Sequence, residues 1–129
     1  NSINSKTQTL KIEDLNNTKE TKEIINNYLK SHPAIKGIFV PSSRIYIVVN
    51  CMEKELLKNI ELIGFDNTPQ NTQCLLNDTI SFLISQKPFN QGYESVRLLV
   101  DNIVHNKIPE AKTYLPIDIL IKENVIYNS

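Results

Sequence analysis

The fold is decided by residues 60–66, which read Ile-Glu-Leu-Ile-Gly-Phe-Asp. This run is short and mostly apolar, and its closing acidic residue is followed by three turn-forming residues, Asn67, Thr68 and Pro69. Apolar runs of this length are typical of strands that lie buried in a parallel sheet. We therefore interpret residues 60–66 as a buried parallel strand that ends in a turn.

Strand signals recur on both sides of this segment. Residues 37–40 form a short apolar run that ends at Pro41, and residues 79–85 form a similar one. Residues 115–121 alternate between apolar and polar side chains, and residues 9–15 alternate more loosely. We interpret these four segments as further strands.

Helix signals fall between the strands. Asn17 and Glu20 form a capping box that predicts a helix start, and Pro33 follows the expected end of this helix. Pro88 opens a long helix with an apolar stripe at helical spacing: Phe89, Tyr93, Val96, Leu99, Val100, Ile103 and Val104. Residues 42–57 occupy the position of a crossover helix although they contain a β-branched run, so we interpret them as helical through burial. The alternation predicts an α/β fold, a parallel sheet with flanking helices and right-handed crossovers.

The amino-acid composition narrows the classes of function that this chain could have. The chain has 129 residues, enough for one domain, with 40% hydrophobic and 22% charged residues. Fourteen basic residues balance fourteen acidic ones, whereas domains that grip nucleic acid normally carry a basic excess. Any contact with DNA would then be made by another part of the molecule. No apolar run approaches the ~20 residues that cross a bilayer, and no secretory signal pattern is visible, so no membrane partner is expected.

Signs of catalysis and of cofactor binding are missing from the sequence. It contains three glycines and no phosphate-binding or nucleophile-elbow motif, and its acidic residues show no general acid–base spacing. His32 and His105 lie beside helix ends, where the helix dipole favours them, so neither is expected to bind metal. Cys51 and Cys74 are too few for a disulfide framework, and we interpret them as free thiols, with a reactive or bridged pair as the alternative. We expect a protein that is not an enzyme and needs no cofactor.

The strand ending in Gly64-Phe65-Asp66 resembles the effector-binding domain of LacI-type transcriptional regulators and of the related periplasmic sugar-binding proteins. The match continues through the strand that ends at Gln86, through residues 91–93, and through the closing strand at 114–123. The resemblance covers about residues 8–124.

By this resemblance, such domains have two α/β lobes joined by three crossing strands, with the ligand in the cleft between them. Residues 1–129 would be the C-terminal lobe of a periplasmic-binding-protein-like type I fold. Within it, residues 1–86 would form the lobe core and 87–116 would pack on the missing N-terminal lobe. Residues 117–124 would be the closing strand.

The function implied is sensing of a sugar-like effector by a cytoplasmic LacI-type regulator, with DNA bound only through an N-terminal domain absent here. The alternative is a periplasmic sugar receptor for a transporter or membrane sensor. An enzyme with a flavodoxin-like fold is a third possibility, against which the missing phosphate loop argues. The exposed stripe expected on the helix after Pro88 favours a homodimer or an exchange of segments between chains.

Four residues are candidates for ligand binding. Asp66 ends a buried strand, where its carboxylate could accept bonds from two sugar hydroxyls, although it could also simply begin a turn. Gln86 carries an amide that both donates and accepts, which suits a polyol, or it could be a solvated loop residue. Ser42 and Ser43 stand where relatives usually have Asn-Asp, and capping of the next helix is an equal possibility for them. The adjacent Arg44 could bind an acidic group, with an exposed salt bridge as the simpler expectation.

Overall fold

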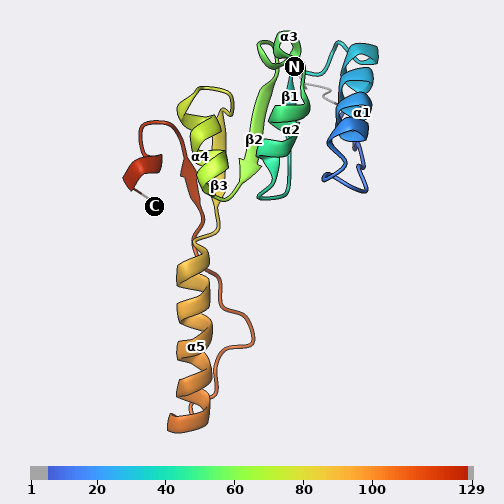
Figure 1. Ribbon diagram of the computed structural model, residues 1–129. Helices are drawn as coiled ribbons and strands as arrows, with labels where there is room; N and C mark the ends of the chain where they lie inside the picture. The colour runs from blue at the N-terminus through green and yellow to red at the C-terminus, as the bar shows by residue number, and fades with distance from the viewer. Residues whose placement is uncertain (1–5, 128–129) are drawn as a thin grey trace, which may run out of the picture.

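The computed structural model describes residues 6–127, so residues 1–5 and 128–129 of the expected lobe lie outside the described part. A four-stranded sheet has the order β1-β2-β3-β4 (Figure 1). Strands β1 (Gly37–Phe39), β2 (Glu61–Phe65) and β3 (Phe82–Ser85) are parallel, and β4 (Asp118–Leu120) is antiparallel to β3. The α/β class with flanking helices is thereby confirmed.

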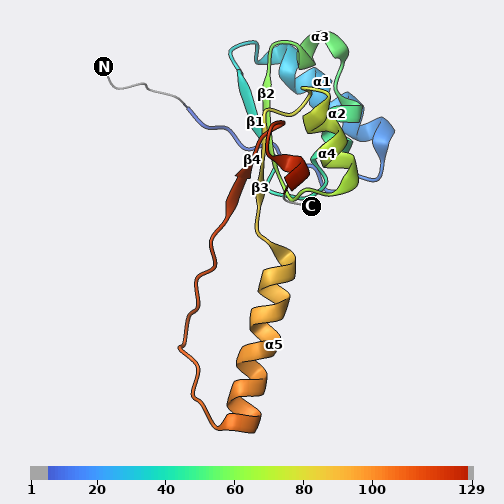
Figure 2. The same ribbon diagram turned by 90° about the vertical axis from the view of Figure 1, so that its left-hand side faces the viewer.

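Four helices pack on one face of this sheet. They are α1 (Thr18–Ser31), α2 (Ile45–Cys51), α3 (Lys54–Leu57) and α4 (Pro69–Leu76), and Figure 2 shows them all on the same side. A short 3-10 helix, Val125–Tyr127, closes the described chain. The hydrophobic core therefore lies between the sheet and this single layer of helices.

The core is built from alternate residues of the strands and one face of each helix. Leu62, Leu83 and Leu120 are fully buried beneath the helices, as is Ile45 of α2. A Cβ atom added to Gly64 would lie 2.6 Å from the Ile45 side chain, so only glycine lets α2 approach β2 this closely. The helix expected within residues 42–57 is confirmed as α2, because burial of its β-branched side chains outweighs their weak helix propensity.

The opposite face of the sheet carries the alternate side chains of each strand, and this face is also apolar. Phe39 is 52% exposed and Ile119 is 61% exposed, and Phe65 packs its ring 5.6 Å from that of Phe39. No helix of residues 6–127 covers this face (Figure 2). The prediction of buried strands is thus correct for the helix side only, since these strands are half-exposed on the other side.

Residues 9–15 do not form the strand that their alternation suggested. They are irregular, and Leu10 is 39% exposed, whereas Ile12 and Leu15 pack against the core. A strand needs a neighbour to pair with, and no strand among residues 6–127 pairs with this segment. The hydrophobic contacts of Ile12 and Leu15 therefore form without a ladder of hydrogen bonds.

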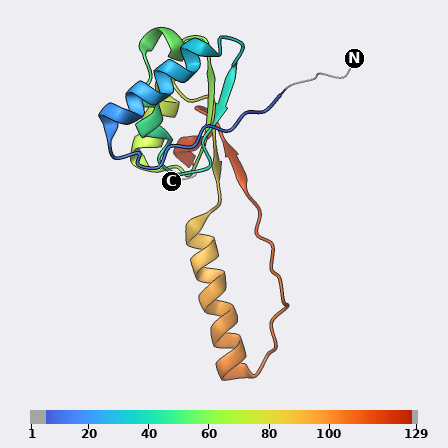
Figure 3. The ribbon, with the colours of Figure 1, turned by 90° about the vertical axis from the view of Figure 1, so that its right-hand side faces the viewer.

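Two further differences concern α4 and β4. Helix α4 was not predicted, because Thr68 and Pro69 were interpreted as turn residues. In the structure they start the helix: the Thr68 hydroxyl accepts a hydrogen bond from the backbone N–H of Asn71, and Pro69 occupies the first turn. The closing strand is antiparallel rather than parallel. The chain leaves the sheet at the end of β3, and it returns to the sheet beside that same end of β3 to form β4 (Figure 3). It is also shorter than the alternation at 115–121 suggested.

Helix α5 (Pro88–His105), predicted to begin at Pro88, extends away from the body formed by the sheet and helices α1–α4, which is called the lobe from here on. Residues 106–117 run back beside α5 (Figures 2 and 3). None of its residues is buried. Its polar side is organised by Arg97, which pairs with Glu94 at 2.7 Å and with Asp101 at 3.2 Å. Its apolar stripe is exposed along the whole helix, with Leu99 at 58% and Ile103 at 67%.

Candidate ligand site at the carboxyl edge of the sheet

The topology brings the four predicted site residues to one edge of the sheet. Ser42 and Ser43 follow β1, Asp66 comes directly after β2, and Gln86 comes directly after β3. Because β1, β2 and β3 are parallel neighbours, their carboxyl ends meet at the same edge. Ligands of open α/β sheets bind at this edge.

Asp66 is held firmly by its backbone while its carboxylate stays available. Its N–H donates to the carbonyl of Ile84 at 2.9 Å, which extends the pairing of β2 with β3 by one residue. The backbone has a φ of 62°, a left-handed conformation that aspartate tolerates better than most residues. The half-buried carboxylate has no hydrogen-bond or ion-pair partner within residues 6–127, and the cap of α4 is Thr68 rather than Asp66. Its oxygens can therefore accept bonds from a ligand.

Asn71 connects the segments that form this edge of the sheet, and its role was not predicted from the sequence. Its side chain is fully buried, and its amide nitrogen lies 2.8 Å from the carbonyl oxygen of Ser43 and 3.0 Å from those of Phe65 and Asp66. Its amide oxygen accepts a bond from the backbone of Tyr46 at 3.2 Å. One side chain thus connects the loop after β1, the end of β2 and the start of α2. The Thr68–Pro69 helix start was the available signal, since it places Asn71 in the first turn of α4.

We expect Asn71→Ala to destabilise the chain by about 2–3 kcal/mol, because it leaves several backbone groups near Asp66 without their partner. Urea unfolding followed by circular dichroism measures this change. Gln73→Ala is the matched control, because Gln73 is exposed on the same helix and bonds only to the exposed Asn77, so its effect should stay within about 0.5 kcal/mol. Equal midpoints for the two variants would show that Asn71 does not hold the edge together.

Gln86 lies between buried Ser85 and the start of α5. Its carbonyl accepts a bond from the side chain of Gln91 at 2.9 Å. Its own side-chain amide has no hydrogen-bond partner among residues 6–127, so both its donor and its acceptor remain available at the carboxyl edge.

Ser42 and Ser43 do not cap α2, so the capping role expected as the alternative for them is not found. The Ser42 hydroxyl accepts a bond from the backbone of Arg44 at 3.3 Å, which forms a tight turn before the helix. Arg44 itself is the N-cap residue, and no side chain caps α2 there. The exposed salt bridge expected for Arg44 is not found in the described part of the chain, where the ion pairs all join other residues. Ser42 and Ser43 are half-buried at the site.

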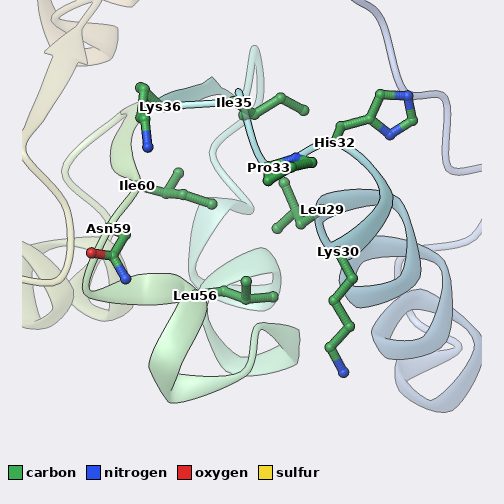
Figure 4. Close-up of a pocket in the computed structure, with 9 residues that line it drawn as sticks. All are labelled: Leu29, Lys30, His32, Pro33, Ile35, Lys36, Leu56, Asn59 and Ile60. Carbon is green, nitrogen blue, oxygen red and sulfur yellow. The ribbon is translucent and has the colours of Figure 1, made fainter.

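The hollow in Figure 4 is a separate feature at the opposite edge of the sheet. It has a volume of about 260 Å³ and lies between the C-terminal end of α1, helix α3 and the starts of β1 and β2. Its apolar lining includes Leu29, Ile35, Leu56 and Ile60. None of the four predicted site residues borders it, so it is not part of the carboxyl-edge site.

The cysteines belong to the packing rather than to the site. Both are free thiols, as predicted, with Cys51 buried and Cys74 half-buried. Burial raises the pKa of each thiol above its usual value, which disfavours the reactive thiolate.

Within residues 6–127, no three His, Cys, Asp or Glu side chains gather to hold a metal ion. No helix of this part of the chain is both long enough and apolar enough to span a membrane.

The fold and the site edge together define one part of a lobe of the periplasmic-binding-protein-like type I fold. Residues 3–107 match the family described as periplasmic binding protein domain, and the chain belongs to this family. No curated protein sequence matches the chain significantly.

Solved structures support the same family. A candidate LacI transcriptional regulator from Bacteroides fragilis is 33% identical, with a TM-score of 0.74 over 84% of this chain. GanP, a glucose-galactose binding protein from Geobacillus stearothermophilus, is 24% identical, with a TM-score of 0.71 over 83% of this chain. A periplasmic solute binding protein of an ABC transporter from Actinobacillus succinogenes, with bound D-allose, is 22% identical, with a TM-score of 0.72 over 85% of this chain. The chain spans 38% to 39% of the length of these three proteins.

Proposed function

We propose that this chain is the C-terminal lobe of a protein that binds a sugar or a close derivative between two lobes, and that it acts by binding rather than by catalysis. The observation that carries the proposal is the unpartnered carboxylate of Asp66 at the carboxyl edge of the sheet. Ser42, Ser43 and Gln86 would complete this half of the site, and the second lobe would supply the other half.

The chemistry of this edge suits a polyol. A carboxylate accepts hydrogen bonds from hydroxyl groups, and such charge-assisted bonds are about twice as strong as neutral ones. An amide such as that of Gln86 can donate to one hydroxyl oxygen and accept from another hydroxyl. Polyhydroxylated ligands also occur among the similar proteins, since one is described with bound D-allose, a sugar, and another with myo-inositol, a cyclic polyol.

For the biological role we favour effector sensing by a cytoplasmic LacI-type regulator. The similar protein at 33% identity is a candidate LacI regulator, and the others cited are 22% to 24% identical. The chain has zero formal charge, so DNA would be bound by a separate N-terminal domain. The effector would shift the population of open and closed lobes and so change how paired subunits present their DNA-binding domains.

The alternative is a periplasmic sugar receptor for a transporter or membrane sensor, which the likeness to solute binding proteins supports. The sequence that precedes this lobe in the intact protein distinguishes the two roles. A helix-turn-helix domain there would establish the regulator, and a secretory signal would establish the receptor.

The same proposal assigns residues 87–116 to packing on the N-terminal lobe and residues 117–124 to the closing strand. The exposed apolar stripe of α5 supports this assignment, because large exposed apolar patches mark surfaces that pack against another surface. We also propose that subunits pair as a homodimer, which analytical ultracentrifugation of the intact protein would test. A monomer at all concentrations would contradict the pairing.

A thermal-shift screen of the intact protein tests the binding function. The panel contains D-allose, myo-inositol, D-arabinose, further hexoses and pentoses, sugar phosphates and nucleosides. A ligand at 100 times its dissociation constant stabilises a protein by ~2.7 kcal/mol, which gives a clear rise in melting temperature. A sugar hit supports the proposal. The absence of any sugar among the hits, with the protein folded, would contradict it.

A further inference from the structure

Lys87 adopts a backbone conformation that its residue type does not favour. Among residues 6–127, four non-glycine residues have positive φ, and the other three are Asp66, Asp78 and Asn106. Aspartate and asparagine tolerate this region through their short polar side chains, whereas lysine does not. Lys87 has φ 52° and ψ 62°, which costs about 1–2 kcal/mol and persists only where surrounding contacts enforce it.

Lys87 makes two contacts in this conformation. Its backbone N–H donates to the hydroxyl of buried Ser85 at 3.3 Å. Its ammonium lies 2.9 Å from the carboxylate of Asp118, and the two side chains are only 30% and 32% exposed. This ion pair is better shielded than the pair of Lys30 with Glu53, whose side chains are 54% and 42% exposed. Shielded pairs are screened less by water and salt than exposed ones.

The ion pair lies where the chain leaves the lobe and where it returns. Residues 88–117, here called the arm, are joined to the lobe through β3 on one side and β4 on the other (Figures 2 and 3). Ser85 and Asp118 face each other in the antiparallel pairing of these strands. Lys87 therefore links the exit of the arm to its entry, immediately before Pro88 starts α5.

We propose that the Lys87–Asp118 ion pair is a clasp that sets the direction of the arm relative to the lobe and positions Gln86 at the carboxyl edge. This inference rests on the proposed function, because the arm would carry contacts to the second lobe. With the pair intact, Lys87 stays left-handed and α5 leaves the lobe in one direction. Without it, residues 86 and 87 relax toward ordinary backbone angles and the arm samples many directions.

Residual dipolar couplings of the weakly aligned, ¹⁵N-labelled 129-residue chain test the clasp without any ligand. In the unaltered chain, the N–H couplings of α5 should fit the same alignment tensor as those of α1, α2 and α4. In Lys87→Gln and in Asp118→Asn, the degree of order of α5 should fall by about a third or more, as expected for a change from rigid to flexible attachment. Unchanged couplings in α1, α2 and α4 would show that the lobe itself remains folded.

Two further variants separate a clasp from a general loss of charge. The exchange Lys87→Asp with Asp118→Lys should restore most of the order of α5, because the pair is re-formed with its ends reversed. Lys30→Gln removes an ion pair of 2.7 Å far from the arm and should leave α5 unchanged. If α5 keeps the order of the lobe in both single variants, or is already independent of the lobe in the unaltered chain, the clasp is overturned. A failed sugar screen would leave this outcome unaffected, so the two proposals fail separately.

Discussion

In the intact protein, Asp66→Ala is expected to weaken sugar binding by at least about 100-fold while the protein stays folded. Each charge-assisted hydrogen bond contributes ~1.5–3 kcal/mol, so losing bonds to two hydroxyls removes about 3 kcal/mol or more of binding free energy. The carboxylate has no partner within the described chain, so its removal breaks no internal contact there. Isothermal titration calorimetry with the sugar found in the screen measures the loss of affinity.

Asp78→Ala provides the control for this experiment. Asp78 also has a left-handed backbone, with φ 57°, so alanine introduces the same kind of strain at both positions. Asp78 lies before β3, at the edge of the sheet opposite Asp66, and its carboxylate pairs with Lys122 at the surface. Exposed pairs of this kind contribute little to stability. Unchanged affinity in Asp78→Ala is expected, and ordinary binding by Asp66→Ala would overturn the assignment of the site.

The largest expected loss of stability comes from Leu83→Ala, at about 3–5 kcal/mol. Leu83 is fully buried in β3 beneath the helices, and its truncation removes buried apolar surface and leaves a cavity. Leu99→Ala is the matched truncation in α5, where the side chain is 58% exposed, and in this chain it should change the unfolding free energy by less than about 0.5 kcal/mol. Chemical denaturation of both variants, compared with the unaltered chain, gives the two values.

The Leu99 variant also tests the proposed packing of residues 87–116. From the apolar pattern alone, truncation of Leu99 or Ile103 is expected to destabilise by a few kcal/mol, but only if the side chain is buried. Both are exposed in the described chain. In the intact protein, the N-terminal lobe would cover them, and Leu99→Ala should then cost about 2 kcal/mol or more. A negligible effect in the intact protein would contradict this assignment.

Much of the fold could be predicted because its signals are local. The capping pair Asn17 and Glu20 marks the start of α1, with the Asn17 side chain accepting from the backbone of Glu20 at 3.3 Å. Pro88 marks the start of α5, and three short apolar runs mark β1, β2 and β3. The weak helix signal of residues 45–49 was interpreted correctly only because its position between two strands outweighed its composition.

Other features depend on partners that are distant in the sequence. Residues 9–15 have the alternation of a strand, yet a strand forms only beside another strand, which local sequence does not specify. The direction of β4 depends on the route of the chain through α5 and back, which the residues of the strand do not specify. Asn71 looked like an ordinary polar residue because its partners come from two distant segments, Ser43 in the loop after β1 and Phe65 and Asp66 at the end of β2.

The sequence by itself therefore determined the α/β class, the helix boundaries that carry capping signals, and the position of Asp66 and Gln86 after strands, because propensity and hydrophobic period act over a few residues. Only the tertiary structure decided that the helices cover one face of the sheet, that β4 runs antiparallel, and that Asn71 joins the site segments. It also placed Lys87 beside Asp118, which are 31 positions apart in the chain. Contacts of this kind arise from packing between distant segments, and local residue patterns carry no record of them.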